Sequence, residues 1–182
     1  MTGLFVLTGA PGSGKSTILD HLGGDIRVIG EPAREILAEQ RAIDGDGVHD
    51  RDRSLFVALL LQRSIDKYVA AQGEERPVVF DRGVPDCIAY AQLMDLDPAP
   101  SLEAAAAHRY QRDVLILEPW EAIYDTDDER TMSFEQTHPF HEALVDAYAR
   151  TGYSLVVVQT GSVDDRAAFV RGFIDARSTG GG

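Results

Sequence analysis

An eight-residue stretch near the start of the chain has the residue types and the spacing needed to bind phosphate. Residues 9–16 read Gly-Ala-Pro-Gly-Ser-Gly-Lys-Ser and match the pattern Gly-x4-Gly-Lys-Ser/Thr. The glycines let backbone N–H groups turn toward an anion without side-chain clashes. Lys15 would lie along the β- and γ-phosphates of a nucleotide, and the Ser16 hydroxyl would bind Mg²⁺. The sequence therefore predicts that this loop binds ATP together with Mg²⁺.

The surroundings of the loop fit the same chemistry. The apolar run 4–8 predicts a buried strand before the loop, and a helix is expected over 14–22. That helix would direct the positive end of its dipole at the phosphates. A second loop follows a strand expected at 154–159 and lies where an adenine could pack, unless Ser162 or Asp164 simply caps the helix that follows. The residues expected to hold the nucleotide are Gly9, Ala10, Pro11, Gly12, Ser13, Gly14, Lys15, Ser16 and Thr17, with Gly161, Ser162 and Val163.

Two carboxylates follow other expected strands. Strands are predicted at 27–30 and 78–81, and ligands gather at the carboxyl ends of parallel strands. Glu31 precedes Pro32, so it is either an acidic helix cap or the group that takes a proton from an acceptor hydroxyl. Asp81 ends an apolar strand, as expected for a carboxylate that reaches Mg²⁺ directly or through water. The alternative for Asp81 is a helix cap or a turn.

Three arginines stand near these positions in the sequence. Arg34, one turn after Glu31, would hold the acceptor or neutralise phosphate charge, unless it forms a surface ion pair. Arg82 follows Asp81 and is expected to contact a phosphate or the acceptor. Arg130 lies in an acidic stretch after the fourth expected strand, where a lid arginine would reach the transferring phosphoryl group. Otherwise Arg130 pairs with its acidic neighbours.

Strand-like and helical patterns alternate along the chain, without repeats or an internal linker. Runs of consecutive apolar residues are typical of strands that are covered on both faces. The alternation predicts an α/β fold of three layers with a mainly parallel sheet. We expect a single domain over 1–177 and a disordered tail over 178–182. Helices are expected at 14–22, 32–41, 52–72, 85–93, 102–109, 134–150 and 163–177, and strands at 4–8, 27–30, 78–81, 113–117 and 154–159.

Composition restricts the class of partner and the compartment. The formal net charge of −13 would repel a polyanion, so we expect neither a nucleic-acid nor a membrane partner. The apolar run 55–61 is too short to span a bilayer and is either a central core helix or a homodimer contact. The single cysteine, Cys87, cannot form an internal disulfide, and no N-terminal signal is visible. These features predict a cytoplasmic protein.

Several motifs of other nucleotide-binding classes are missing from the sequence. The chain contains no asparagine, which rules out the Asn-Lys-x-Asp motif for guanine and the asparagine sensor of ring-forming mechanical ATPases. Asp81 is followed by Arg82 and not by the glutamate with which those machines activate water. The five histidines show no spacing typical of a metal site.

Four further segments accompany the phosphate-binding loop. They read Glu-Pro-Ala-Arg-Glu at 31–35, Asp-Arg-Gly-x-Pro-Asp at 81–86, Pro-Trp-x3-Tyr-x2-Asp-x2-Arg at 119–130 and Gly-Tyr at 152–153. With them, nearly the whole chain resembles a family of P-loop ATPases and kinases that includes the nicotinamide riboside kinase-like domain of the bacterial NAD regulator. The first two segments are also similar to motifs of deoxynucleoside kinases. The resemblance implies a five-stranded parallel sheet in the order 2-3-1-4-5.

The same resemblance implies roles for individual residues: Glu31 would be the base, Asp81 would associate with Mg²⁺ and Arg82 would contact the acceptor. Together with the loop, this predicts an ATP- and Mg²⁺-dependent kinase acting on a hydroxyl of a nucleoside-like or other small acceptor. The alternative is a nucleotide-binding regulator with slow ATPase activity. An acceptor pocket enclosed by 42–53 and 120–133 would favour the kinase. The expected catalytic residues are Lys15, Glu31, Asp81 and Arg130, the acceptor-binding residues Glu31, Arg34 and Arg82, and the metal ligands Ser16 and Asp81.

Overall fold

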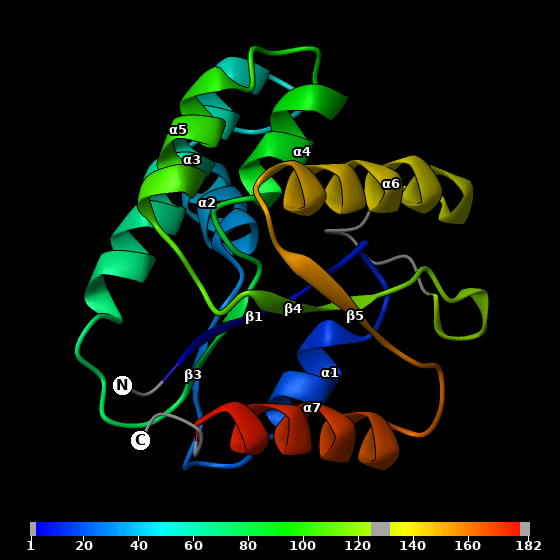
Figure 1. Ribbon diagram of the computed structural model, residues 1–182. Helices are drawn as coiled ribbons and strands as arrows, with labels where there is room; N and C mark the ends of the chain where they lie inside the picture. Colours follow the sequence, from blue (N-terminus) through cyan, green and yellow to red (C-terminus); the bar gives the residue numbers. More distant parts are fainter. Residues whose placement is uncertain (1–2, 125–131, 179–182) are drawn as a thin grey trace.

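The computed structural model describes residues 3–124 and 132–178 (Figure 1). Parallel strands form a central sheet, and helices cover both of its faces (Figure 1). The strands are β1 (Leu4–Gly9), β2 (Arg27–Ile29), β3 (Val78–Asp81), β4 (Asp113–Leu117) and β5 (Ser154–Val158). The helices are α1 (Lys15–Asp20), α2 (Pro32–Ala42), α3 (Arg53–Ala70), α4 (Asp86–Leu93), α5 (Ala99–Ala107), α6 (Phe134–Arg150) and α7 (Val163–Ser178), with a 3₁₀ turn at Glu121–Ile123.

The order of the strands confirms the fold that the sequence predicts. The sheet runs β2-β3-β1-β4-β5, and each neighbouring pair is parallel. Leu7 of β1 lies beside Asp81 of β3, and Gly9 lies beside Leu117 of β4. The carboxyl ends of these three strands therefore meet at one edge of the sheet, which is where ligands bind in folds of this kind.

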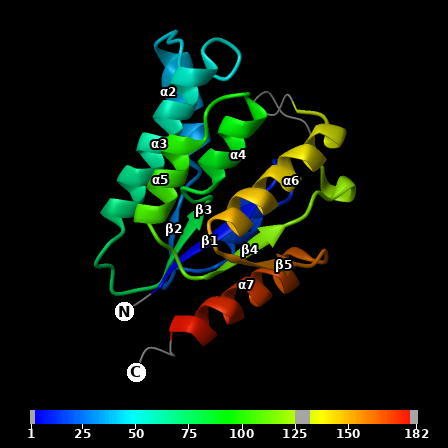
Figure 2. The same cartoon turned by 45° about the horizontal axis from the view of Figure 1, so that its top comes forward.

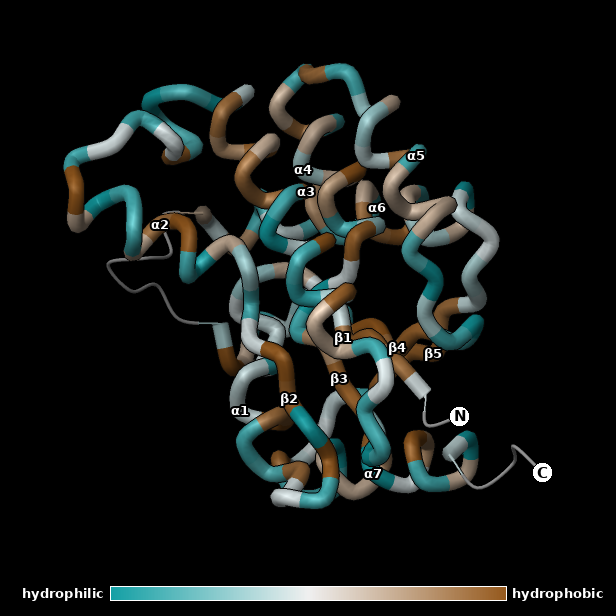
Figure 3. The backbone as a smooth tube through the Cα atoms, turned by 90° about the vertical axis from the view of Figure 1, so that its left-hand side faces the viewer, coloured by the Kyte–Doolittle hydropathy of each residue, from teal (hydrophilic) through white to brown (hydrophobic). Residues whose placement is uncertain are grey.

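Alternate residues of β1 enter the two halves of the core. Phe5 and Leu7 pack with apolar residues of α1 and α7, whereas Val6 packs with residues of α4 and α6. Figures 1 and 2 show the corresponding layers, with α1 and α7 on one face of the sheet and α4 and α6 on the other. Burial on both faces explains why the strands read as continuous apolar runs. In Figure 3, the strands accordingly appear as mostly hydrophobic segments in the middle of the molecule.

The apolar run 55–61 lies in α3. Phe56, Val57 and Leu60 are buried in a cluster with residues of α2 and α4. Leu55, by contrast, keeps 40% of its surface exposed. Most of this run therefore belongs to the hydrophobic core, as one of the two alternatives predicts. The homodimer contact stays a prediction.

Several helix boundaries differ from those expected by one to three residues, including those of α5 and α7. Helix α5 begins at Ala99, three residues before the expected start, because Asp97 accepts a hydrogen bond of 3.0 Å from the Ala99 N–H and Pro100 is tolerated in a first turn. Helix α7 continues through Ser178, which the sequence assigns to the tail. The rest of that tail, 179–182, lies outside the described residues. No helix in the described ranges is long and apolar enough to cross a membrane.

Candidate active site

The loop between β1 and α1 has the backbone shape that the glycine pattern predicts. Gly14, the residue before α1, has a φ of 88°, and Gly12 has a φ of 77°. Both values lie in the left-handed region that side chains disfavour. A Cβ at Gly12 would stand 2.6 Å from the ring of Tyr124, and one at Gly14 would stand 2.9 Å from the Arg166 guanidinium. Glycine is thus required at both positions, because the backbone conformation is left-handed and because Tyr124 and Arg166 approach too closely for a side chain.

Lys15 is buried at the centre of this loop. Its Nζ atom donates hydrogen bonds of 3.0 Å to the Gly9 carbonyl and 3.2 Å to the Ala10 carbonyl. Burial and the positive charge of Arg82 lower the pKa of Lys15 to about 8, although neighbouring carboxylates oppose this shift. The side chain is therefore still mainly protonated at neutral pH and has a third N–H for an anion.

Glu31 occupies the N-cap position of α2, but its side chain does not cap the helix. Instead, its Oε1 accepts a hydrogen bond of 2.8 Å from Arg82 Nε, and its Oε2 accepts one of 3.1 Å from Arg34 Nε. Burial opposes ionisation, but the positive charges of Arg82 and Lys15 outweigh it and lower the pKa of Glu31 to about 2. Glu31 is thus a carboxylate at every working pH, and it faces cations rather than helix N–H groups.

Asp81, at the end of β3, has the features of an outer ligand for a divalent cation. It is buried, and its Oδ1 has no hydrogen-bond partner within the described residues. Burial raises its pKa, against the opposing charge of Lys15. Such an unpaired carboxylate oxygen fits Mg²⁺, which prefers oxygen ligands and usually keeps several waters. The described ranges contain no group of three His, Cys, Asp or Glu that could hold a metal, so Ser16 and the nucleotide phosphates would have to supply further ligands.

Arg82 is held in an uncommon backbone conformation. Its φ of 74° is one that non-glycine residues rarely adopt, and its N–H donates to the Leu7 carbonyl at 3.1 Å. Its Nη1 donates to Asp86 at 3.1 Å, and its guanidinium lies 5.3 Å from the centre of the Phe140 ring. Such local strain persists only where the surrounding contacts overdetermine it, and it is often found at functional sites.

Asp86, in the first turn of α4, anchors Arg82. Besides the bond from Arg82, its carboxylate accepts hydrogen bonds from the Thr8 hydroxyl at 2.6 Å, from the Gly83 N–H at 2.9 Å and from the Tyr148 hydroxyl. Asp86 is almost fully buried, so these donors replace the water that it loses. Sequence reasoning did not identify this role, although the i,i+4 spacing from Arg82 was available as a signal.

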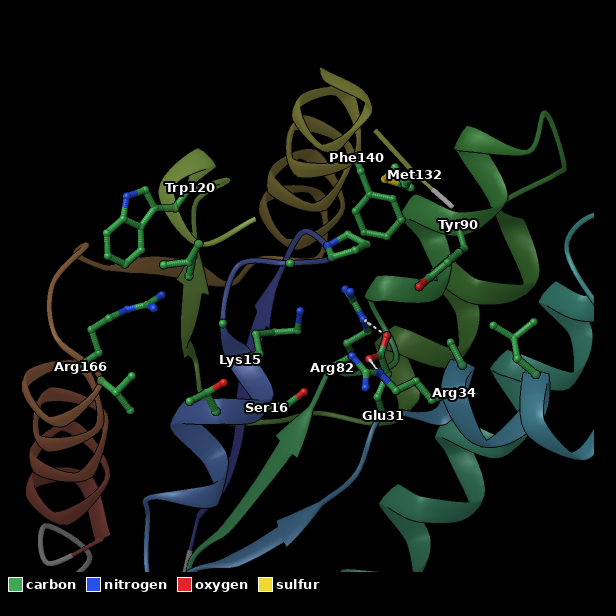
Figure 4. Close-up of a pocket in the computed structure, with 18 of the residues that line it drawn as sticks. Lys15, Ser16, Glu31, Arg34, Arg82, Tyr90, Trp120, Met132, Phe140 and Arg166 are labelled. Carbon is green, nitrogen blue, oxygen red and sulfur yellow. Dashed lines mark hydrogen bonds and ion pairs between the residues drawn. The ribbon is translucent and has the colours of Figure 1, made fainter. Parts of the chain in front are cut away.

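One cavity of about 470 Å³ extends from the phosphate-binding loop into a region lined by Glu31, Arg82, Phe56, Tyr90 and Phe140, which we call the second compartment. Figure 4 shows Lys15 between two groups of side chains, with Trp120 and Arg166 on one side and Glu31, Arg82 and Tyr90 on the other. The volume is within the range of sites for small molecules. Aromatic rings line the second compartment edge to face, with centres 6.0 Å apart for Phe56 and Tyr90 and 5.1 Å apart for Tyr90 and Phe140.

Most of the residues that the sequence selects line this one cavity, and a few lie beneath it or outside the description. His49 and Met132 line it too, from the two segments expected to enclose an acceptor. Gly9, Ala10, Ser13 and Asp81 are buried next to the cavity without lining it, which favours contact of Asp81 with Mg²⁺ through water. Arg130 lies outside the described residues. The lining residues from the prediction are Pro11, Gly12, Gly14, Lys15, Ser16, Thr17, Glu31, Arg34, Arg82, Gly161, Ser162 and Val163.

The walls of the cavity include residues for which the sequence carried no clear signal. Tyr90 and Phe140 lie in helices where an apolar face is expected in any case. Arg166 is a charged residue near the start of α7, and only the packing of that helix brings it to the phosphate-binding loop. Trp120 belongs to the segment 119–130 that the sequence analysis singled out, but the sequence did not indicate on which side of the cavity it would lie.

Comparison with known proteins places the chain in a family. A family model described as an AAA domain matches residues 4–166. The protein belongs to this AAA domain family. No curated protein matches the chain at the level of sequence.

Solved structures share the fold. The NadR protein in complex with NR matches with a TM-score of 0.72 and 20% identity over 98% of this chain. NadR with NAD and AMP-PNP matches with a TM-score of 0.72 and 19% identity over 98% of this chain. The chain covers only 51% and 50% of these two NadR chains. The thymidylate kinase from Ehrlichia chaffeensis matches with a TM-score of 0.61 and 16% identity, over 94% of this chain and 99% of that one. These identities establish a fold of the kind found in P-loop kinases and not a substrate.

Proposed function

We propose that this AAA-family protein is an ATP- and Mg²⁺-dependent kinase that phosphorylates a hydroxyl of a nucleoside-like small molecule. The observation that carries the proposal is that one cavity contains both the phosphate-binding loop and the second compartment with Glu31. A nucleotide-binding regulator has no need for a second compartment with a carboxylate beside the phosphate site.

The acceptor would bind between the aromatic rings and Glu31. Phe56, Tyr90 and Phe140 offer apolar surface suited to a planar group, such as a nucleoside base. Glu31 accepts hydrogen bonds only, so it suits the O–H of a hydroxyl and would repel an anionic phosphate. Arg34 is partly exposed at the same place and can contact a second oxygen of the acceptor.

Phosphoryl transfer would form a bond between the acceptor oxygen and the γ-phosphorus. It would break the bond between that phosphorus and the bridging oxygen, which leaves with ADP. Glu31 would orient the hydroxyl and take up its proton; a weak base suffices, because bond formation is late in a loose transition state. Lys15, Arg82 and Arg130 would stabilise the charge on the phosphoryl oxygens. Bound Mg²⁺ would neutralise phosphate charge, held directly by Ser16 and through water by Asp81.

The test is ADP release by the purified protein with ATP and Mg²⁺, measured against a panel of nucleosides, vitamin precursors and other small alcohols. Lys15→Ala serves as the blank, since it removes the ammonium without changing the fold class. We expect one class of acceptor to raise the rate by at least about a hundredfold, with no stimulation in the variant. Slow ATP hydrolysis at a rate that no acceptor changes would contradict the kinase proposal and favour the regulator with ATPase activity.

A further inference from the structure

Helix α6 contacts the surroundings of Arg82 at two points on one face. Near the middle of the helix, the Phe140 ring lies against the Arg82 guanidinium, with 5.3 Å between the ring centre and Cζ. About two turns later, the Tyr148 hydroxyl donates a hydrogen bond to Asp86, which in turn binds Arg82. Leu144 lies between them, and all three helix residues belong to the same buried cluster. The helix therefore touches Arg82 once directly and once through a carboxylate.

Two hydrogen bonds fix the plane of the Arg82 guanidinium. Its Nε donates to Glu31 at 2.8 Å, and its Nη1 donates to Asp86 at 3.1 Å, which leaves Nη2 without a partner among the described residues. Because the donors of arginine form a rigid planar fork, the two carboxylates decide where Nη2 points. Figure 4 shows Arg82 and Glu31 next to Lys15, so Nη2 is the nitrogen that a phosphoryl oxygen would meet.

The Tyr148 hydroxyl helps to fix the Asp86 carboxylate. Oδ2 of Asp86 accepts from this hydroxyl and from the Gly83 N–H at 2.9 Å, whereas Oδ1 accepts from Thr8 and Arg82. Tyr148 is fully buried, and burial together with the Asp86 charge raises its pKa, so the hydroxyl keeps its proton and donates. Neither Tyr148 nor Asp86 lines the cavity, so both would act on a substrate only through Arg82.

We propose that Tyr148 is a positioning residue that, through Asp86, sets the orientation of Arg82 and thereby its alignment with Glu31 and the phosphoryl group. This inference rests on the proposed transfer to an acceptor hydroxyl. Without the Tyr148 hydroxyl, Asp86 loses one of its two donors at Oδ2 and is free to turn, and the Arg82 fork turns with it. A displacement of about 1 Å in a site of this kind can lower the rate about a hundredfold.

Tyr148→Phe tests the inference, and Tyr153→Phe is its matched control. Both changes remove one hydroxyl from a buried tyrosine, and the two rings are neighbours, with centres 5.6 Å apart. The Tyr153 hydroxyl accepts a hydrogen bond of 3.2 Å from the Tyr110 N–H and does not bind Asp86. A loss of packing or stability alone should therefore affect the two variants alike, whereas a loss of positioning should affect only Tyr148→Phe.

The first readout needs neither nucleotide nor acceptor. In the NMR spectrum, the Arg82 Nε–H signal is assigned by its loss in Arg82→Lys, and its exchange with solvent reports how often the bond to Glu31 opens. We expect this exchange to be at least about tenfold faster in Tyr148→Phe and to change less than about twofold in Tyr153→Phe. Equal exchange rates in the natural protein and Tyr148→Phe would overturn the inference.

The second readout is kcat, measured with ATP, Mg²⁺ and the nucleoside from the panel that gives the fastest ADP release. We expect Tyr148→Phe to lower kcat at least about tenfold and to change the dissociation constant of ADP less than about threefold. Tyr153→Phe should keep kcat within about twofold of the natural protein. Equal losses of kcat in the two variants would mean that Tyr148 has a structural role only.

Together the two readouts separate the possible failures. Faster exchange in Tyr148→Phe, without acceptor-dependent ADP release by the natural protein, would support the orientation of Arg82 by Tyr148 and contradict the kinase. Faster exchange with an unchanged kcat would overturn the role in transfer and leave the kinase intact. If Tyr148→Phe does not fold, 4-fluorophenylalanine at position 148 fills the space of the hydroxyl without donating a hydrogen bond, and the same outcomes apply to it.

Discussion

Lys15 carries a positive charge in a buried position, which predicts that nucleotide binding depends on pH. Its pKa of about 8 in the free protein means that above this value the ammonium loses its proton. An anion needs the protonated form, so binding at higher pH requires uptake of a proton. We therefore expect the affinity for ADP to fall, approaching tenfold per pH unit above about 8.

The measurement is the dissociation constant of ADP between pH 7 and 9.5, in EDTA so that no metal contributes. Lys15→Arg is the control, because arginine keeps its charge over this range and should show a flat profile. A profile for the natural protein as flat as that of the variant would mean that Lys15 does not titrate in this window.

Glu31 and Glu35 allow a matched test of the proposed base. Both lie at the start of α2, but Glu31 lines the cavity, whereas Glu35 pairs with Lys67 and Arg63 outside it. We expect Glu31→Gln to lower kcat about a hundredfold or more, and to change the dissociation constant of ADP less than about threefold. Glu35→Gln should leave kcat nearly unchanged. An unchanged kcat in Glu31→Gln would show that Glu31 does not act as a base and has only a structural role at the start of α2.

At the scale of elements, a buried ion pair joins the end of β3 to α4. Arg82 and Asp86 form an i,i+4 pair with side chains that are each 2% exposed, and Asp86 also binds Thr8 and Tyr148. Asp86→Ala would leave the Arg82 charge buried with fewer partners. We expect a loss of about 3–5 kcal/mol in the free energy of unfolding, measured with urea.

The control is another i,i+4 pair of the same two residue types. Asp146 and Arg150 of α6 have side chains that are 52% and 44% exposed. Asp146→Ala should therefore cost less than about 1 kcal/mol, as exposed pairs usually do. Similar losses for the two variants would show that burial of the first pair contributes nothing.

For the whole molecule, the net charge of −13 predicts weak binding to polyanions. The cations of the cavity can hold a nucleotide locally, but the extended backbone of a nucleic acid would meet a largely acidic surface. We expect no gel retardation of a DNA oligonucleotide at about 150 mM salt and no phosphate transfer to its free 5′-hydroxyl. Micromolar binding that weakens steeply with salt would contradict this expectation and favour a nucleic-acid kinase.

The parts of the protein that depend on neighbouring residues were predictable from the sequence. The glycine loop follows from the types and spacing of residues 9–16, and the parallel sheet follows from apolar runs that alternate with helical patterns. Glu31 and Asp81 could be placed because each directly follows or ends an expected strand. Such features obey short-range geometry, in which spacing along the chain sets position in space.

Other parts of the site depended on how separate elements pack. Arg82 meets Glu31 across 51 residues, and Arg166 meets Ser13 across 153. No local pattern encodes these distances, because they follow from the order of the strands and from the helices that cover each face of the sheet. The same packing makes Tyr90 of α4 and Phe140 of α6 walls of the cavity. The sequence thus predicted the phosphate site and its chemistry, whereas long-range packing decided what lies on either side of it.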